Sequence, residues 1–191
     1  MKKDIILSGV GGQGILTIAA VIGLAAMEEG LFVKQSEVHG MSQRGGAVLS
    51  HLRISSKEIF SDLISKGSAD IILSVEPMEA LRYLPFLKPE GWLITNSKPF
   101  INISNYPDEN KLIEEIKSLP HSIIIDANQI AKNIKVPKAS NIVMVGASSP
   151  YLDINFTNLE IAVKKLFLRK GDALIASNLQ ALKIGRKAVI N

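Results

Sequence analysis

The chain of 191 residues contains no cysteine. Disulfide bonds, a thiol nucleophile and thiolate ligation of an iron–sulfur cluster by this chain are therefore excluded. The G-x-S-x-G pattern of hydrolases and the H-E-x-x-H pattern of zinc enzymes are absent too, which argues against both classes. Any electron-transfer centre that works with this protein is expected in a partner.

Concentrated charge and long apolar runs are lacking as well. The 22 basic and 18 acidic residues leave a net charge of +4, and the lysines are scattered, so the sequence predicts no nucleic-acid-binding surface. The apolar run at residues 15–27 is shorter than the roughly 18 residues of a membrane-spanning helix. Asp4 and the glycines at 9–14 argue against a signal peptide. We expect a soluble, cytoplasmic protein without membrane contact.

Hydrophobic residues make up 47% of the chain and fall into alternating strand-like and helix-like segments. This alternation predicts one Rossmann-like α/β domain over residues 1–191, with three layers and a mostly parallel or mixed open sheet. Strands are expected at 4–8, 31–38, 47–54, 71–75, 92–95 and 122–125. Helices are expected at 15–27, 76–84 and 172–189, after Asp108, from Asp126 and from Thr157.

Several expectations concern the ends and faces of these elements. Leu16, Ala20 and Leu24 make a second side of the first helix apolar, which predicts a helix buried nearly all round. The residues 89–91, Pro-Glu-Gly, predict a turn before the strand at 92. Glu76 is interpreted as a favourable charge at a helix start, beside Pro77.

Two helix starts have the spacing of a capping box. These are Asp126 with Gln129, and Thr157 with Glu160. Asp126 is therefore interpreted as an N-cap. Ligands of open α/β sheets gather at the carboxyl ends of the strands, which here carry Ser8-Gly9, Glu76, Asn96 and Asp126. The sequence indicates no paired-carboxylate mechanism and no metal site.

The run Gly9-Val10-Gly11-Gly12-Gln13-Gly14 follows the first expected strand and has the spacing G-x-G-x-x-G. Such a turn presents backbone N–H groups to a phosphate at the positive end of a helix, or simply packs a strand tightly against a helix. A dinucleotide site usually adds an acid roughly 20 residues later, but that count from Gly14 reaches Lys34. Gln13 could hydrogen-bond a ligand or a facing subunit, or it could secure the turn.

A second polar loop spans residues 36–46 and contains Glu37, His39, Gln43, Arg44, Gly45 and Gly46. Glycines there permit unusual backbone angles, and the Arg44 guanidinium offers a planar donor fork for a carboxylate or phosphate. An ordinary mobile hairpin connection is the competing interpretation. His39 has no identified partner, so it is given no catalytic role.

Together the six-residue glycine motif and the Gln43-Arg44-Gly45-Gly46 loop resemble the gamma domain of 2-oxoacid:ferredoxin oxidoreductases. Similarity extends over nearly the whole chain, through residues 76–81, the strand ending at Asn96, residues 141–146 and residues 178–182. The residues 39–43 ahead of Arg44 are similar to the indolepyruvate branch of that family.

The resemblance implies a division of labour between chains. This chain would hold no cofactor alone, while a larger partner subunit would carry thiamine diphosphate, Mg²⁺ and iron–sulfur clusters. The implied reaction is oxidative decarboxylation of an aryl 2-oxoacid with coenzyme A as co-substrate and ferredoxin as electron acceptor. The chain by itself is expected to be inactive.

By the same resemblance, the ligand-facing turn would comprise Gly9, Gly11, Gly12, Gln13 and Gly14. The second loop near it would comprise Glu37, His39, Gln43, Arg44, Gly45 and Gly46, with Arg44 recognising an anionic group of coenzyme A or the substrate. Two alternatives stay open: the gamma subunit of a pyruvate or 2-oxoglutarate ferredoxin oxidoreductase, and a non-catalytic Rossmann-like nucleotide-binding regulator.

Overall fold

The computed structural model describes residues 1–39 and 45–190. Six strands form one sheet in the order β2-β3-β1-β4-β5-β6. Their bounds are β1 (Lys2–Val10), β2 (Phe32–His39), β3 (Ala47–Ser55), β4 (Ala69–Ser74), β5 (Leu87–Asn96) and β6 (Ser122–Ile125). β1, β4, β5 and β6 pair in parallel, whereas β3 runs antiparallel to both β1 and β2. The sheet is therefore mixed.

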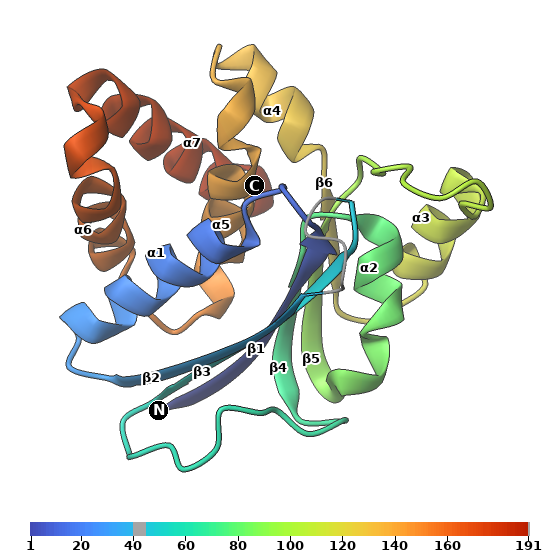
Figure 1. Ribbon diagram of the computed structural model, residues 1–191, viewed down its shortest axis with the longest axis horizontal. Helices are drawn as coiled ribbons and strands as arrows, with labels where there is room; N and C mark the ends of the chain where they lie inside the picture. Colours follow the sequence, from blue (N-terminus) through green and yellow to red (C-terminus); the bar gives the residue numbers. More distant parts are fainter. Residues whose placement is uncertain (40–44, 191) are drawn as a thin grey trace.

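Helices cover both faces of the sheet, so the domain has the expected three layers (Figure 1). One face carries α1 (Ile15–Glu28), α5 (Ser140–Ser148), α6 (Phe156–Phe167) and α7 (Asp172–Ile190), and the other carries α2 (Pro77–Arg82) and α3 (Glu109–Lys117). α4 (Ala127–Asn133) follows β6, and four short 3-10 helices lie at Leu84–Phe86, Pro137–Ala139, Ser149–Tyr151 and Leu168–Lys170. No helix among the described residues is long and apolar enough to span a membrane.

The pleat of β1 divides the core between these layers. Ile5 and Leu7 point into the larger cluster under α1 and α5, while Ile6 points into the smaller cluster with Ile72 and Leu93. All five side chains are buried. Because successive strand residues face opposite sides, a buried central strand reads as a continuous apolar run.

Two expectations about local structure were wrong. Leu16 and Met27 are exposed, because α1 packs on the sheet and on α5 and α6 and leaves this side of the helix partly uncovered, with Ala20 and Leu24 half-buried. Residues 89–91 lie inside β5 rather than before it, because a bulge shifts the pairing from Ala69↔Leu87 to Ile71↔Trp92. A bulge lets a strand absorb turn-forming residues without ending.

The helix caps gave one confirmed prediction and one error. The Asp126 side chain accepts a hydrogen bond from the Gln129 N–H at 2.7 Å, as an N-cap does. The Thr157 prediction was wrong: the N-cap lies two residues earlier, at Asn155, whose side chain accepts from the Thr157 N–H at 3.0 Å.

α5 and α7 pack backbone against backbone. A Cβ atom at Gly146 would lie 2.1 Å from the Leu182 carbonyl oxygen, and one at Gly185 would lie 2.1 Å from the Val143 carbonyl oxygen. Neither neighbour is a flexible side chain that could move aside. These two glycines therefore set the separation of the two helices.

We expect Gly185→Ala to lower the free energy of unfolding by about 2 kcal/mol, because the added methyl forces the two helices apart and outweighs the better helix propensity of alanine. Urea unfolding and the Tm measure this loss. Lys187→Ala, at an exposed position of the same helix, is the control and should stay near wild type. An unchanged Tm for Gly185→Ala would contradict the close packing.

Candidate functional site

The glycine run lies at the carboxyl end of β1, where the chain turns into α1. A Cβ atom at Gly9 would lie 2.4 Å from Cγ2 of Val75, the residue after β4. Gly14 has a φ of 83°, and a Cβ there would lie 2.4 Å from Nδ2 of Asn141 on α5. Only glycine fits both constraints at Gly14, so the motif serves close packing as well as any ligand.

Gln13 holds the turn closed. Its Oε1 accepts a hydrogen bond from the Val10 N–H at 2.7 Å, and its Nε2 donates to the Val75 carbonyl oxygen at 3.5 Å. The side chain thus ties the end of β1 to the end of β4. Of the interpretations left open for Gln13, securing the turn is confirmed; ligand contact stays a prediction.

The second loop meets the glycine turn through its backbone. The Gly11 N–H donates to the Gly46 carbonyl oxygen at 2.9 Å. Gly11, Gly12, Gly14 and Glu37 line one pocket of about 530 Å³. Gln43 and Arg44 lie outside the described residues, and His39 is described only as the last residue of β2.

A second pocket of about 430 Å³ opens on the other side of Gly12, over the ends of β4, β5 and β6. After β1 the chain enters α1 on one face of the sheet, and after β4 it enters α2 on the other. Such a divergence is where open α/β sheets bind ligands. Side chains that line the pocket include those of Gln13, Asn96, Phe100, Asn128 and Lys138. We call it the switch-point pocket.

The polar floor of the switch-point pocket is internally satisfied. The Asn96 amide is buried; its Nδ2 donates to Asn128 Oδ1 at 2.9 Å, and its Oδ1 accepts from the Ala127 N–H at 3.0 Å. This arrangement fixes the direction in which the Asn128 side chain lies. Asn96 therefore acts as a structural link between β5 and α4.

The electrostatics of this pocket favour an anion. Lys138 is its only charged lining residue among those described. The first turns of α1 and α5 meet near Lys138, since Asn141 Nδ2 donates to the Gly14 carbonyl oxygen at 3.4 Å. Helices of 14 and 9 residues thus bring their positive ends together next to a lysine.

The buried carboxylate of Glu76 holds the 97–108 loop, which borders the switch-point pocket and the second polar loop. Glu76 is fully buried; its Oε2 caps α2 by accepting from the Glu79 N–H at 2.8 Å, which confirms its expected place at a helix start. Its Oε1 accepts from the Phe100 N–H at 3.3 Å and from the Tyr106 hydroxyl. Burial and the bond to Glu76 raise the pKa of Tyr106 far above its usual range.

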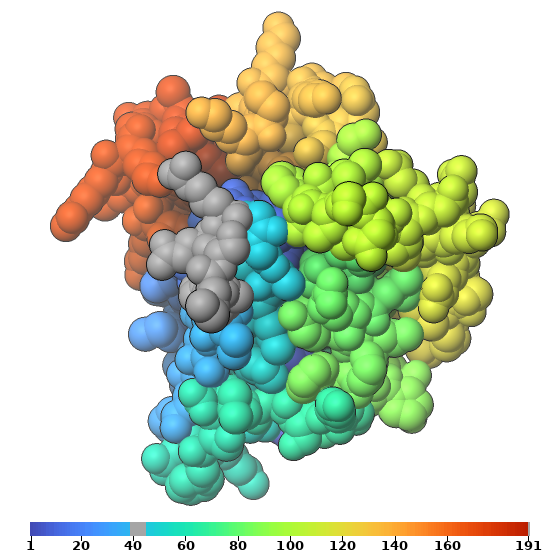
Figure 2. Space-filling view, turned by 45° about the vertical axis from the view of Figure 1, so that its right-hand side comes forward, coloured from blue at the N-terminus to red at the C-terminus, as the bar shows by residue number. Residues whose placement is uncertain are grey.

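The loop at 97–108 reaches from Glu76 to the second polar loop. Asn102 Nδ2 donates to the Gly45 carbonyl oxygen at 2.6 Å. Figure 2 shows this loop, in yellow-green, beside the cyan start of β3 on the surface. The Glu76–Tyr106 bond therefore holds one wall of the site against the glycine turn.

Comparisons with known proteins identify the family. A model of the family described as pyruvate ferredoxin/flavodoxin oxidoreductase matches residues 4–188. The chain belongs to this family. It is 36% identical over 200 residues to the indolepyruvate oxidoreductase subunit IorB of Archaeoglobus fulgidus, covering 100% of this chain and 97% of the relative. It is also 36% identical to IorB of Thermococcus kodakarensis, over 98% of this chain and 96% of that one.

Solved structures of this oxidoreductase family share the fold. The pyruvate oxidoreductase subunit PORC of Thermotoga maritima superposes with a TM-score of 0.75 at 20% identity, over 97% of this chain and 96% of that one. The 2-oxoglutarate:ferredoxin oxidoreductase of Magnetococcus marinus, solved with 2-oxoglutarate, coenzyme A and succinyl-CoA bound, gives a TM-score of 0.78 at 22% identity. The match covers 98% of this chain and 31% of that protein's chain.

Sequence reasoning missed part of the pocket in this family member. Lys138, Asn128 and Phe100 were not predicted as site residues, although they line the switch-point pocket. Asn128 carried a signal, since it follows the N-cap Asp126 at the end of an expected strand. Lys138 carried none, because only the tertiary contact of α5 with Gly14 brings it to the glycine turn.

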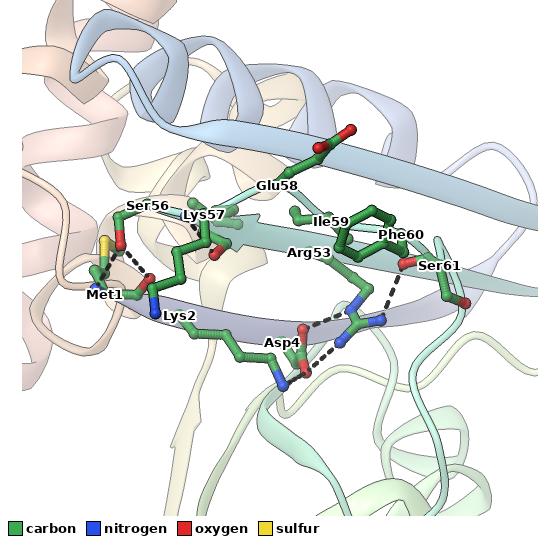
Figure 3. Close-up of a pocket in the computed structure, with 12 residues that line it drawn as sticks. Met1, Lys2, Asp4, Arg53, Ser56, Lys57, Glu58, Ile59, Phe60 and Ser61 are labelled. Carbon is green, nitrogen blue, oxygen red and sulfur yellow. Dashed lines mark hydrogen bonds and ion pairs between the residues drawn. The ribbon is translucent and has the colours of Figure 1, made fainter.

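A pocket of about 650 Å³ lies away from the site, at the start of β1 and the end of β3 (Figure 3). Asp4 is buried there, with its two oxygens bonded to Arg53 Nε and Nη2 at 2.8 and 3.1 Å. Lys2 adds a third cationic contact at 3.0 Å. Arg53 also donates to the carbonyl oxygens of Ser61 and Leu63, so this cluster attaches the 56–68 loop to the sheet.

The paired geometry makes the Asp4 cluster sensitive to acid. Burial alone would raise the pKa of Asp4, but the hydrogen bonds from Arg53 and Lys2 outweigh it and the pKa is lowered. Because the pKa of Asp4 is lower in the folded than in the unfolded chain, its ionisation stabilises the fold at pH values above the unfolded-state pKa, near 4. This stabilisation is lost as the pH falls through the folded-state pKa.

We expect Asp4→Asn to lower the free energy of unfolding by about 3 kcal/mol at neutral pH, because it leaves the Arg53 guanidinium without its buried partner. The difference from wild type should shrink as the pH falls below about 4, because the unfolded wild-type chain then binds a proton on Asp4 that the folded state binds only at lower pH. Urea unfolding across pH measures both. Asp153→Asn, at a 60% exposed carboxylate paired with Lys3, is the control and should show neither effect.

We expect Tyr106→Phe to destabilise the 97–108 loop by about 2 kcal/mol, the value of a hydrogen bond to a charged acceptor. Hydrogen exchange should then increase in that loop and at Gly45–Gly46. Tyr151→Phe is the control, because no described residue hydrogen-bonds the Tyr151 hydroxyl. Equal exchange in wild type and Tyr106→Phe would show that the loop does not depend on Glu76.

Proposed function

We propose that this chain is the cluster-free, gamma-type subunit of an indolepyruvate:ferredoxin oxidoreductase. The observation that carries the proposal is the full-length identity of 36% to IorB of Archaeoglobus fulgidus. A 2-oxoglutarate synthase subunit KorC from Methanothermobacter marburgensis is 30% identical over 77% of this chain. This lower identity supports the family, but it supports 2-oxoglutarate as the substrate less strongly than indolepyruvate. The reaction joins an aryl 2-oxoacid to coenzyme A with loss of CO₂ and reduction of ferredoxin.

The partner subunit supplies the redox and decarboxylation chemistry in this proposal. Thiamine diphosphate with Mg²⁺ would supply the decarboxylation chemistry there, and iron–sulfur clusters would supply electron transfer to ferredoxin. This chain has no cysteine to ligate a cluster. Among its described residues there is no group of three His, Asp or Glu side chains to hold a metal ion. The side chains of this chain therefore suit binding of a co-substrate better than binding of an iron–sulfur cluster or of thiamine diphosphate with Mg²⁺.

The role of this chain is to bind and orient the anionic part of coenzyme A at the switch-point pocket. Gly12 of the glycine turn and Ser140 at the start of α5 line that pocket, where backbone N–H groups would bind a phosphate, and Lys138 adds a point charge. Arg44, whose position the structure does not describe, is proposed to contribute from the second loop. Phe100, held through Glu76, shields one side of the bound group.

The proposal is tested on the complete complex, purified through a tag on this chain. Ferredoxin reduction is measured with indolepyruvate, phenylpyruvate, pyruvate and 2-oxoglutarate. We expect kcat/KM for the aryl acids to exceed that for pyruvate by at least about tenfold, and no turnover by the chain alone. Preference for pyruvate or 2-oxoglutarate would assign the complex to another branch of the family. Tight NAD(H) binding by the chain without a co-purifying partner would support the regulator alternative.

Variants of the same complex test the role of the pocket. Lys138→Ala and Arg44→Ala should each raise the KM for coenzyme A by about tenfold, the cost of one charge-assisted contact, with little change in the KM for the oxoacid. Lys132→Ala, on the exposed face of α4, is the matched control. Unchanged coenzyme A kinetics in both variants would contradict this placement of the co-substrate.

A further inference from the structure

A third pocket of about 480 Å³ lies on the far side of Asn141 from the glycine turn. The start of α1, residues 136–141, the end of α6 and the first half of α7 enclose it. We call it the α6–α7 pocket. The proposed coenzyme site does not use it, although the two pockets share Lys138.

The walls of the α6–α7 pocket are largely apolar. Val136 and Pro137 face it from one side, and Phe167 and Leu174 from the other. Phe167 is buried, while Leu174 is 38% exposed. The volume is within the roughly 300–1,000 Å³ of small-ligand pockets, and aromatic and aliphatic walls favour a flat apolar group.

The charge of this pocket has one sign. Lys138 and Lys170 line it, and no acidic side chain among the described residues does. Neither lysine forms an ion pair with any of the described residues. Lys170 Nζ instead lies 5.3 Å from the centre of the Phe167 ring. A cation beside an aromatic wall complements a ligand that joins a ring to an anion.

A buried amide gives the pocket a specific hydrogen-bonding group. Asn178 lines the pocket and is only 4% exposed. Its Nδ2 donates to the Leu174 carbonyl oxygen at 2.8 Å. No described residue donates to its Oδ1, so the oxygen is the atom available to a ligand. An acceptor in a largely apolar pocket favours a ligand with an N–H or O–H donor.

We propose that the α6–α7 pocket binds an aromatic carboxylate whose ring carries a hydrogen-bond donor, such as an indole or phenol acid. The ring lies between Phe167 and Val136, the ring donor bonds Asn178 Oδ1, and the carboxylate faces Lys170. This assignment rests on the proposed function for the identity of the acid, since it deepens the aryl-acid specificity. A phosphate is the poorer match, because apolar side chains make up much of the wall of this pocket.

Calorimetric titration of the full chain tests the proposal with three probes. Indole-3-acetate carries the ring donor and the carboxylate, 1-methylindole-3-acetate lacks the donor, and adenosine 3′,5′-bisphosphate represents the nucleotide end of coenzyme A. We expect indole-3-acetate to bind and its N-methyl analogue to bind about tenfold more weakly, the size of one buried hydrogen bond.

Two variants connect the binding to the pocket. Lys170→Gln should weaken indole-3-acetate binding several-fold, and Asn178→Leu should remove the preference over the N-methyl analogue. Lys164→Gln, at an exposed position of α6 that lines none of these pockets, is the control. Circular dichroism and the Tm establish that each variant is folded before titration.

The outcomes separate this inference from the proposed function. The α6–α7 assignment would be overturned if indole-3-acetate does not bind, or if its N-methyl analogue binds with equal affinity. It would also be overturned if adenosine 3′,5′-bisphosphate competes with indole-3-acetate and Lys170→Gln weakens that competition. None of these results bears on ferredoxin reduction by the complex. Conversely, if the complex prefers pyruvate while the chain binds indole-3-acetate as described, the proposed function would be contradicted and the α6–α7 binding site would be supported.

Discussion

The structure depends on the close approach of the end of β1 to β4 and α5. Gly9 leaves no room for a Cβ atom beside Val75, and Gly14 leaves none beside Asn141. This contact lets α1 begin at the carboxyl edge of the sheet and brings the start of α5 alongside it. The convergence of two positive helix ends is therefore a result of packing. A ligand site at this edge uses a geometry that the fold requires in any case.

Many side chains at the same edge hydrogen-bond groups of the protein itself. Gln13 joins β1 to β4, Asn96 joins β5 to α4, and Glu76 joins α2 to the 97–108 loop. Buried polar groups that are bonded internally stabilise one conformation of the surrounding loops. Gly12, Ser140 and Lys138 also line this edge, and their backbone amides, hydroxyl and ammonium groups can bind an anion. In the proposed function, such a site would orient a co-substrate while another chain supplies the bond-breaking chemistry.

The sequence allowed the architecture to be predicted because apolar runs and caps are local signals. The strands predicted at 71–75 and 122–125 are confirmed by β4 and β6. The predicted Asp126 cap is confirmed by its hydrogen bond with the Gln129 N–H. The bulge around residues 89–91 was mistaken for a turn, since bulges are set by the partner strand. The exposure of Leu16 could not be predicted because helical periodicity does not say which neighbours will cover a face.

The site was predictable only where it lies close in sequence. Gly11, Gly12 and Gly14 lie within one turn, and Gly46 reaches Gly11 by a backbone bond. Lys138 reaches the same pocket through a contact between residues 127 positions apart, Gly14 and Asn141. No local pattern encodes such a contact. Long-range packing was needed to add Lys138 to the glycine motif.

The sheet order around the glycine motif differs from that of an ordinary dinucleotide site. In that site the strand after the glycine helix lies directly beside the first strand and carries the ribose-binding acid. Here the antiparallel β3 separates β2 from β1. Glu37 on β2 is thereby moved to two strand spacings, roughly 10 Å, from β1. The inserted strand therefore changes where an acid on β2 lies relative to the glycine turn, although Glu37 still lines one pocket with that turn.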